Sequence, residues 1–207
     1  MRKPKFIIVI NGKGGVGKDT LVEMARKHFS VENISSIDPI KDAALYLGWT
    51  GDKSNKARKF LADLKKLVTD FNDYPTVSLI TKTITFLKSN SDILFVHIRE
   101  GEEITKYINN INVLKVTKQD QINTLKSFDS LTSPYDYRII TLLIRRESIN
   151  NKEYGNTSDD DVENYKYMYT FHNDSPLDDT EYIFLMFLLG IFNEIKDKQP
   201  TIPYIDE

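Results

Sequence analysis

Residues 6–20 read FIIVINGKGGVGKDT, and this stretch decides the fold. It begins with a run of apolar, mostly β-branched residues, which is typical of a strand buried on both faces of a sheet. Residues 12–17, called the glycine loop below, contain four glycines, and a helical pattern of apolar residues starts directly after Lys18. The order therefore predicts a buried strand, a tight loop and a helix.

A glycine loop in this context binds phosphate groups through its backbone. Glycines let the chain curl with its amide hydrogens inward, and the positive end of the helix dipole lies behind them. The spacing Gly-x-x-x-x-Gly-Lys is met here, and the Lys18 ammonium supplies mobile charge for the β- and γ-phosphates. An ordinary turn between a strand and a helix is the alternative. We expect a nucleoside triphosphate to bind at Gly12, Lys13, Gly14, Gly15, Val16, Gly17, Lys18, Asp19 and Thr20.

The residue after Lys18 narrows the class of protein. That position is normally Ser or Thr, whose hydroxyl binds Mg²⁺, whereas this chain has Asp19 and then Thr20. Gly-Lys-Asp-Thr resembles the loop of nucleoside monophosphate kinases, in particular the deoxynucleoside monophosphate kinases of bacteriophages and their bacterial relatives. The resemblance implies ATP and Mg²⁺ as cofactors. Asp19 is a candidate for reaching a magnesium-bound water, or it is a favourable residue at the helix N-terminus.

A second resemblance points to another class. The segment from Lys13 to Lys18 is also similar to the loop of partitioning and nitrogenase-iron-protein ATPases, which carry an extra lysine early in the loop. Those proteins follow the second lysine with a hydroxyl residue and are commonly longer than 207 residues. The alternative function is therefore a regulatory or partition-type ATPase switch.

Composition bounds the other possibilities. The 207 residues are 40% hydrophobic and 28% charged, which suits a single globular domain over residues 1–207. A net charge of −2 gives no basic field for nucleic acid, and the absence of cysteine excludes disulfides and thiolate metal sites. The longest apolar run, residues 183–192, is too short to span a bilayer, and the N-terminal apolar run is too short for a signal peptide. We expect a cytoplasmic monomer or homodimer without membrane or nucleic-acid partners.

Apolar periodicity predicts strands that alternate with helices. Strands are expected at residues 5–10, 34–37, 93–98, 113–117, 138–144 and 167–171, and helices at 17–29, 40–47, 54–71, 75–88, 102–109, 118–128 and 180–196. This alternation is typical of an α/β three-layer P-loop NTPase fold, a mostly parallel sheet with helices on both faces. The resemblance to nucleotide kinases further implies a helical acceptor flap at about 39–90 and a lid at about 145–166, mostly the polar loop 148–164.

Ligands of parallel sheets bind beyond the carboxyl ends of the strands, so we searched those positions. Asp38 and Lys41 follow the second strand, where the flap opens, and Arg58 lies further along it. A monophosphate acceptor needs charged donors, which makes the cations Lys41 and Arg58 candidates for binding its phosphate, and Asp38 is a further candidate for substrate binding. The lysines around Arg58 are equally typical of a solvated helix face. Tyr46 and Trp49 are candidates for stacking on a base.

The end of the third strand carries a candidate and a departure. Arg99 resembles the acceptor-binding arginine of nucleotide kinases, although a salt bridge to a nearby glutamate would also explain it. An acidic residue usually ends this strand, yet His97 stands there, and a histidine in this place is more often a satisfied core-edge residue than a catalyst. Either Asp19 or Glu100 is then expected to hold the waters of the magnesium ion, or the protein handles the metal weakly.

The last candidates follow the two remaining strands. Nucleotide kinases close a lid after the strand that ends near Arg145 and Arg146, and Arg145 is expected to stabilise charge during transfer. The acidic residues of this lid are atypical and favour a surface loop; they are Asp159, Asp160, Asp161 and Glu163. Residues 172–175 are expected near the adenine. The sequence thus predicts ATP-dependent phosphoryl transfer to a nucleoside or deoxynucleoside monophosphate, with a kinase of another small metabolite as a further alternative.

Overall fold

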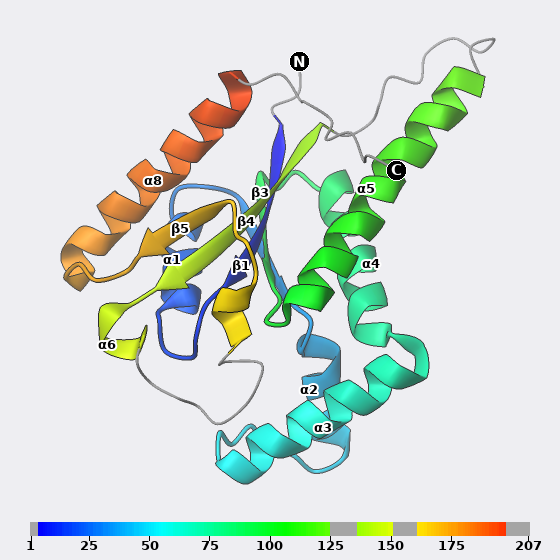
Figure 1. Ribbon diagram of the computed structural model, residues 1–207, viewed down its shortest axis with the longest axis vertical. Coiled ribbons are helices and arrows are strands. Elements are labelled where there is room, and N and C mark those ends of the chain that lie inside the picture. The colour runs from blue at the N-terminus through cyan, green and yellow to red at the C-terminus, as the bar shows by residue number, and fades with distance from the viewer. Residues whose placement is uncertain (1–3, 125–135, 151–160, 198–207) are drawn as a thin grey trace.

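The computed structural model describes residues 4–124, 136–150 and 161–197. Figure 1 shows its strands at the centre, with helices on both sides. The elements in chain order are β1 (Lys5–Asn11), α1 (Lys18–Arg26), β2 (Val31–Ser35), α2 (Asp38–Tyr46), α3 (Asn55–Asn72), α4 (Tyr74–Lys88), β3 (Ile93–His97), α5 (Gly101–Thr124), β4 (Tyr137–Arg145), α6 (Glu147–Asn150), the 3₁₀ turn η1 (Asp161–Asn164), β5 (Tyr169–His172) and α8 (Leu177–Asp197).

The sheet is parallel throughout the described strands, in the order β2-β3-β1-β4-β5. The predicted mostly parallel sheet is therefore confirmed in its stricter form. β1 lies at the centre, where Ile10 is opposite His97 of β3 and Leu142 of β4. The carboxyl ends of β3 and β4 thus flank the start of the glycine loop.

Alternate residues of β1 supply the two halves of the core. Phe6, Ile8 and Ile10 pack among residues of α1 and α8, whereas Ile7 and Val9 pack among residues of α4 and α5. All but Phe6 are completely buried, as expected of a central parallel strand covered on both faces. This alternation produces the three layers, and the predicted fold class is confirmed.

One predicted strand is wrong. Residues 113–117 were expected as a strand on account of their β-branched side chains, but they lie inside α5, which continues from Gly101 to Thr124. Neither Gly nor Pro interrupts the chain here, and extending a helix that already packs on the sheet through Ile104, Tyr107 and Ile111 is easier than starting a strand. The helix expected at 118–128 is the end of α5 as far as Thr124, and its remainder lies outside the described residues.

Two strands are shifted from their predicted places. β2 begins at Val31 and ends at Ser35, not at 34–37, because it pairs with β3 from Ile93 to His97. β2 is an edge strand with polar residues in its middle, so its apolar pattern is weak. β5 begins two residues later than expected, since the Met168 amide donates to the Thr141 hydroxyl at 2.8 Å ahead of the ladder.

The predicted lid contains more regular structure than expected, and the predicted flap is less separate from the core than expected. The loop expected at 148–164 begins with the last three residues of α6 and ends with η1, while residues 151–160, with Asp159 and Asp160, lie outside the described residues. Within the flap, α4 belongs to the core through Leu79 and Phe86. Only α2 and α3 project from the sheet, at the bottom of Figure 1.

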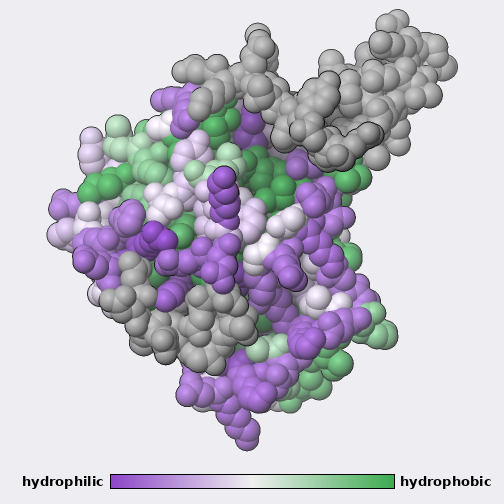
Figure 2. Space-filling model, in the orientation of Figure 1, coloured by the Kyte–Doolittle hydropathy of each residue, from purple (hydrophilic) through white to green (hydrophobic). Residues whose placement is uncertain are grey.

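Hydrophilic residues prevail on the face of α3 that Figure 2 shows, below the sheet. Among the helices of the described residues, none combines the length and the apolar character that crossing a membrane requires.

Candidate functional site

The glycine loop joins β1 to α1 and contains two glycines that no other residue replaces easily. Gly12 has a φ of +146°, and a Cβ there would lie 2.5 Å from the carbonyl oxygen of Ile144. Gly17 has a φ of +93°, and a Cβ there would lie 2.5 Å from Nδ2 of Asn173. The left-handed backbone and the close approach of β4 and the β5–α8 loop therefore explain the Gly-x-x-x-x-Gly spacing.

Lys18, the first residue of α1, folds back over the glycine loop. Its Nζ donates to the carbonyl oxygen of Gly12 and, at 3.0 Å, to that of Lys13. These bonds hold the ammonium beside the loop rather than in solvent. A phosphate group bound by the loop amides would meet this charge with little movement of the side chain.

Asn11 fixes the start of the glycine loop and was not identified from the sequence. It is fully buried, and its Oδ1 accepts from the Gly12 amide at 2.8 Å. Its Nδ2 donates to the carbonyl oxygen of Arg99 at 2.8 Å and to the Tyr167 hydroxyl at 2.7 Å. Burial raises the pKa of Tyr167, so its phenol stays neutral, and it donates in turn to the carbonyl oxygen of Val162 at 2.9 Å. The network ties β1, the β3–α5 connection and the segment before β5 together.

Asn173 fixes the other end of the loop. Its side-chain Nδ2 donates to the carbonyl oxygen of Val16 at 2.8 Å, and its backbone N–H donates to the carbonyl oxygen of Arg145 at 2.8 Å. The side chain is buried, with 8% exposed. The sequence suggested only backbone contacts or a helix start for residues 172–175, so this side-chain role was missed.

Next to Asn173, the chain leaves a shallow hollow. Asp174 accepts a hydrogen bond from the Glu147 amide at 2.7 Å, which joins the β5–α8 loop to the first residue of α6. A cavity of about 440 Å³ lies here, lined by Arg146, Glu147, Ser148 and Asp174. Asp174, one of the residues 172–175 expected near the adenine, lines this hollow.

His97 ends β3 where an acidic residue was expected. The Nε2 atom of His97 is buried and has no hydrogen-bond partner among the described residues. Burial lowers the pKa of His97 to about 4; Asp19 opposes this shift, and Lys18 adds to it. The imidazole is therefore neutral near pH 7, with its charged neighbours at the starts of α1 and α2. An enclosed ring nitrogen without a partner in the described part of the chain is unusual, and a water, an ion or a ligand would satisfy it.

The residues expected to bind magnesium lie in different settings. Asp19 and Thr20 are exposed on the first turn of α1. Across the described ranges, no group of three His, Asp or Glu residues could hold a metal ion by itself. A cation that bridges phosphate oxygens needs few protein ligands, so Asp19 and the unpartnered His97 nitrogen fit a nucleotide-bound Mg²⁺ or similar ion.

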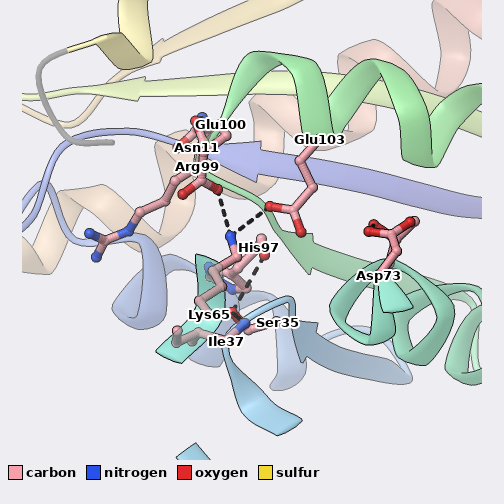
Figure 3. Close-up of polar contacts among 10 residues, drawn as sticks. Asn11, Ser35, Ile37, Lys65, Asp73, His97, Arg99, Glu100 and Glu103 are labelled. Carbon is pink, nitrogen blue, oxygen red and sulfur yellow. Dashed lines mark hydrogen bonds and ion pairs between the residues drawn. The ribbon is translucent and has the colours of Figure 1, made fainter. Parts of the chain in front are cut away.

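Glu100, the other residue expected to hold the waters of the magnesium ion, pairs with a lysine of the flap. Its carboxylate and that of Glu103 both bind Nζ of Lys65 on α3, each at 2.7 Å. Figure 3 shows the three side chains converging, with Arg99 directed away from them. We call Lys65, Glu100 and Glu103 the Lys65 cluster.

The Lys65 cluster joins the flap to the sheet. Lys65 and Glu103 are mostly buried, with 14% and 13% of their side chains exposed. Burial raises the pKa of Glu103 to about 7 despite Lys65. Burial also disfavours the charged form of Glu100, but Lys65 and a hydrogen bond with Glu103 outweigh it and lower its pKa. The sequence had placed Lys65 on a solvated helix face, and that interpretation is wrong.

The two predicted catalytic arginines lie at the ends of β3 and β4, the strands on either side of β1. Arg99 is exposed after β3, and its backbone carbonyl accepts from Asn11. The Glu103 carboxylate, one of the partners considered for Arg99, is bound to Lys65. Arg145 ends β4 and pairs with Glu163 of η1 at 2.7 Å, while its Nε is buried without a partner among the described residues.

The predicted substrate-binding residues of the flap are only partly brought together. Asp38 begins α2, where Oδ2 accepts from the Ser35 amide at 2.8 Å and lies 3.8 Å from Nζ of Lys82. Lys41 is exposed on α2, and its positive charge lowers the pKa of His97. Arg58 is exposed on α3, and its Nε donates to the carbonyl oxygen of Lys53 at 3.1 Å, so its direction toward an acceptor is not evident.

The candidate base-stacking residues, Tyr46 and Trp49, lie at the end of α2. The Tyr46 side chain is 93% exposed. Trp49 donates through Nε1 to the carbonyl oxygen of Asp52 at 3.1 Å.

No protein-family model and no curated protein matches this sequence. Among solved structures, a presumed kinase from Chloroflexus aurantiacus is similar, with a TM-score of 0.53 and 12% identity over 93% of this chain and 98% of that one. TT1252 from Thermus thermophilus has a TM-score of 0.41 and 12% identity over 92% of this chain and 99% of the other. The first likeness shows the fold alone. The chain is an α/β protein of three layers, and it shares this fold with the presumed kinase.

Proposed function

We propose that this protein transfers the γ-phosphate of ATP to a nucleoside or deoxynucleoside monophosphate. The observation that carries the proposal is the glycine loop, closed at both ends by buried asparagines and holding the Lys18 ammonium against its carbonyls. Such a loop is built for the phosphates of a nucleotide. The kinase-like fold gives weaker, independent support.

The donor nucleotide binds across the carboxyl ends of β1 and β4. The loop amides and Lys18 hold the β- and γ-phosphates, and the base occupies the hollow beside Asp174 and Arg146. Arg145 lies between these two places, paired with Glu163. Exchange of Glu163 for a phosphate oxygen would bring the Arg145 guanidinium to the charge that moves during transfer.

The acceptor binds between the end of β3 and the flap. Arg99 and Lys41 supply positive charge there, and the Lys65 cluster fixes α3 relative to β3. A monophosphate is already a nucleophile, so the reaction needs no general base. The work of the protein is to hold two anions in line and to exclude water.

Magnesium would neutralise charge on the phosphates when bound with ATP. Asp19 is placed to hold one of its waters, and the nearby neutral His97 offers a further contact. The residues present therefore fit the cofactor.

A direct assay tests the proposal. The purified protein is incubated with Mg-ATP and each of a panel of ribo- and deoxynucleoside monophosphates, and ADP and the diphosphate product are measured. Formation of one or a few diphosphates, in equal amounts with ADP, is the expected result. Binding of ATP with no transfer to any member of the panel would contradict the proposal.

The second candidate is an ATPase switch that hydrolyses ATP slowly. The observation in its favour is the replacement of the usual acid by His97, which weakens the case for efficient transfer. ADP release that no monophosphate accelerates would favour the switch. Acceleration by a monophosphate favours the kinase.

A further inference from the structure

His97 occupies the position in the site where its chemistry matters most. It is the last residue of β3 and lies opposite Ile10 of β1 in the sheet. Ile10 precedes Gly12 by two residues. Its main chain is fixed, because its carbonyl oxygen accepts from the Ser36 amide at 3.1 Å. Its ring lies within the electrostatic influence of Lys18 and Asp19 at the start of α1 and of Asp38 and Lys41 at the start of α2. The imidazole therefore lies between the donor and acceptor halves of the site.

Glu100, the next acidic residue after His97, does not replace the acid that usually ends this strand. Glu100 is bound to Lys65, and the Lys65 cluster holds it on the flap side of β3. Asp19 is then the carboxylate closest to the glycine loop in sequence, and its charge acts on His97. A cation on the phosphates would meet one carboxylate and one imidazole in place of two oxygen ligands.

We propose that Nε2 of His97 contacts the divalent cation of the bound nucleotide and makes the site prefer Mn²⁺ to Mg²⁺. The inference rests on the proposed binding of ATP. Imidazole nitrogen suits first-row transition metals, whereas Mg²⁺ prefers oxygen ligands and gives up its waters reluctantly. The buried, unpartnered Nε2 atom is the observation behind the proposal, since a contact with a ligand would satisfy it.

The competing role for Nε2 is donation of a hydrogen bond to a phosphate oxygen. The two roles predict opposite effects of a carboxylate at this position. Beside a cation, a carboxylate strengthens binding of Mg-ATP. Beside a phosphate oxygen, it repels ATP whatever cation is present.

The test compares the full chain with His97→Asp, His97→Gln and the control His28→Asn. His28 is exposed at the end of the α1 segment and pairs with Glu181 at 2.8 Å, so it reports the effect of losing a histidine elsewhere. ATP binding is measured by calorimetry with saturating Mg²⁺, with saturating Mn²⁺ and with a chelator. Electron paramagnetic resonance of Mn²⁺ in the ternary complex gives a readout that does not depend on turnover.

We expect the wild-type protein to bind Mn-ATP roughly tenfold more tightly than Mg-ATP, because imidazole nitrogen suits a first-row transition metal better than Mg²⁺. His97→Asp should reduce this ratio to near one while Mg-ATP binds at least as tightly as before. His97→Gln should lower the preference for Mn-ATP over Mg-ATP without adding charge. This variant tests the inference if His97→Asp does not fold. His28→Asn should keep the wild-type ratio.

Two results would overturn the inference. One is a wild-type protein without preference between the two cations. The other is loss of ATP affinity in His97→Asp that is equal for both cations and persists in the chelator, which assigns Nε2 to the phosphates. Absence of ATP binding under all three conditions would instead refute the proposed function, so the two failures are distinguishable.

Discussion

Asn173 and Val16 are separated by 157 positions in the chain, yet the Asn173 side chain donates to the Val16 carbonyl oxygen at 2.8 Å. The glycine loop, which is local in sequence, is therefore completed by a residue from the last third of the protein. Binding of phosphate depends on the loop amides pointing inward, so this hydrogen bond connects the end of β5 to the function of the loop.

Asn173→Ala should weaken both folding and ATP binding. The buried Val16 carbonyl would lose its partner, which costs about 1–3 kcal/mol in the free energy of unfolding. Urea unfolding and calorimetry with ATP check the two effects. Asn193→Ala, at an exposed position of α8, is the matched control and should change neither. Wild-type ATP affinity in Asn173→Ala would show that the loop keeps its shape alone.

Gly12→Ala should destabilise the fold more than Gly48→Ala. Both glycines have positive φ, so alanine is strained at either place, at a cost of about 1–3 kcal/mol. Only at Gly12 would the added Cβ also meet the Ile144 carbonyl oxygen, at 2.5 Å, whereas nothing lies within 4 Å of a Cβ at Gly48. Chemical denaturation of the two variants measures the difference. Equal destabilisation would mean that the loop moves away from β4 without cost.

Lys18→Ala should abolish ATP binding and leave the fold intact. The ammonium donates to the carbonyl oxygens of Gly12 and Lys13, and the side chain is not part of either core cluster. Calorimetry with ATP and thermal unfolding are the measurements, and Lys88→Ala, exposed at the end of α4, is the control. Unchanged ATP turnover in Lys18→Ala would refute the whole functional proposal.

Glu103 should make stability depend on pH. Its pKa is raised by burial to about 7, so between the unfolded value near 4.5 and about 7 the native state binds more protons than the unfolded state. The free energy of unfolding then falls as pH rises through this window. The opposite shift of Glu100 acts below this window, because its pKa is lowered.

Glu103→Gln removes the titrating group and should flatten the profile between pH 5 and about 8. It should also bring stability at pH 8 closer to the value at pH 5. Urea unfolding across this range is the measurement. Glu102→Gln, on the exposed side of α5, should keep the wild-type slope. A wild-type slope in Glu103→Gln would assign the dependence to another group.

The strand, loop and helix at the start of the chain were predictable because their signals are local. Five apolar residues, a glycine spacing and a helical pattern lie next to one another, and β1 and α1 follow them closely. The alternation of elements along the chain similarly predicted the parallel sheet and its covering helices. His97 at a strand end could also be predicted, but the lack of a partner for its Nε2 atom could not.

The rest depended on contacts between distant segments. Lys65 and Lys66 are neighbours of one type, yet Lys65 is buried between two glutamates while Lys66 pairs with Asp70 on the surface. Which lysine faces β3 depends on how α3 turns against the sheet, and no local pattern gives that. Asn11 and Asn173 were likewise ordinary polar residues until the fold placed them at the two ends of the glycine loop.

The order of the strands has a consequence for how the protein is made. β1 and the glycine loop leave the ribosome before one neighbour of β1, the strand β4, and before the closing residue Asn173. A nascent chain halted before residue 137 would therefore expose one edge of its most apolar strand, with a loop not yet able to hold a nucleotide. The glycine loop would therefore be completed only after Asn173 is made, and chaperones would have the preceding interval in which to shield β1.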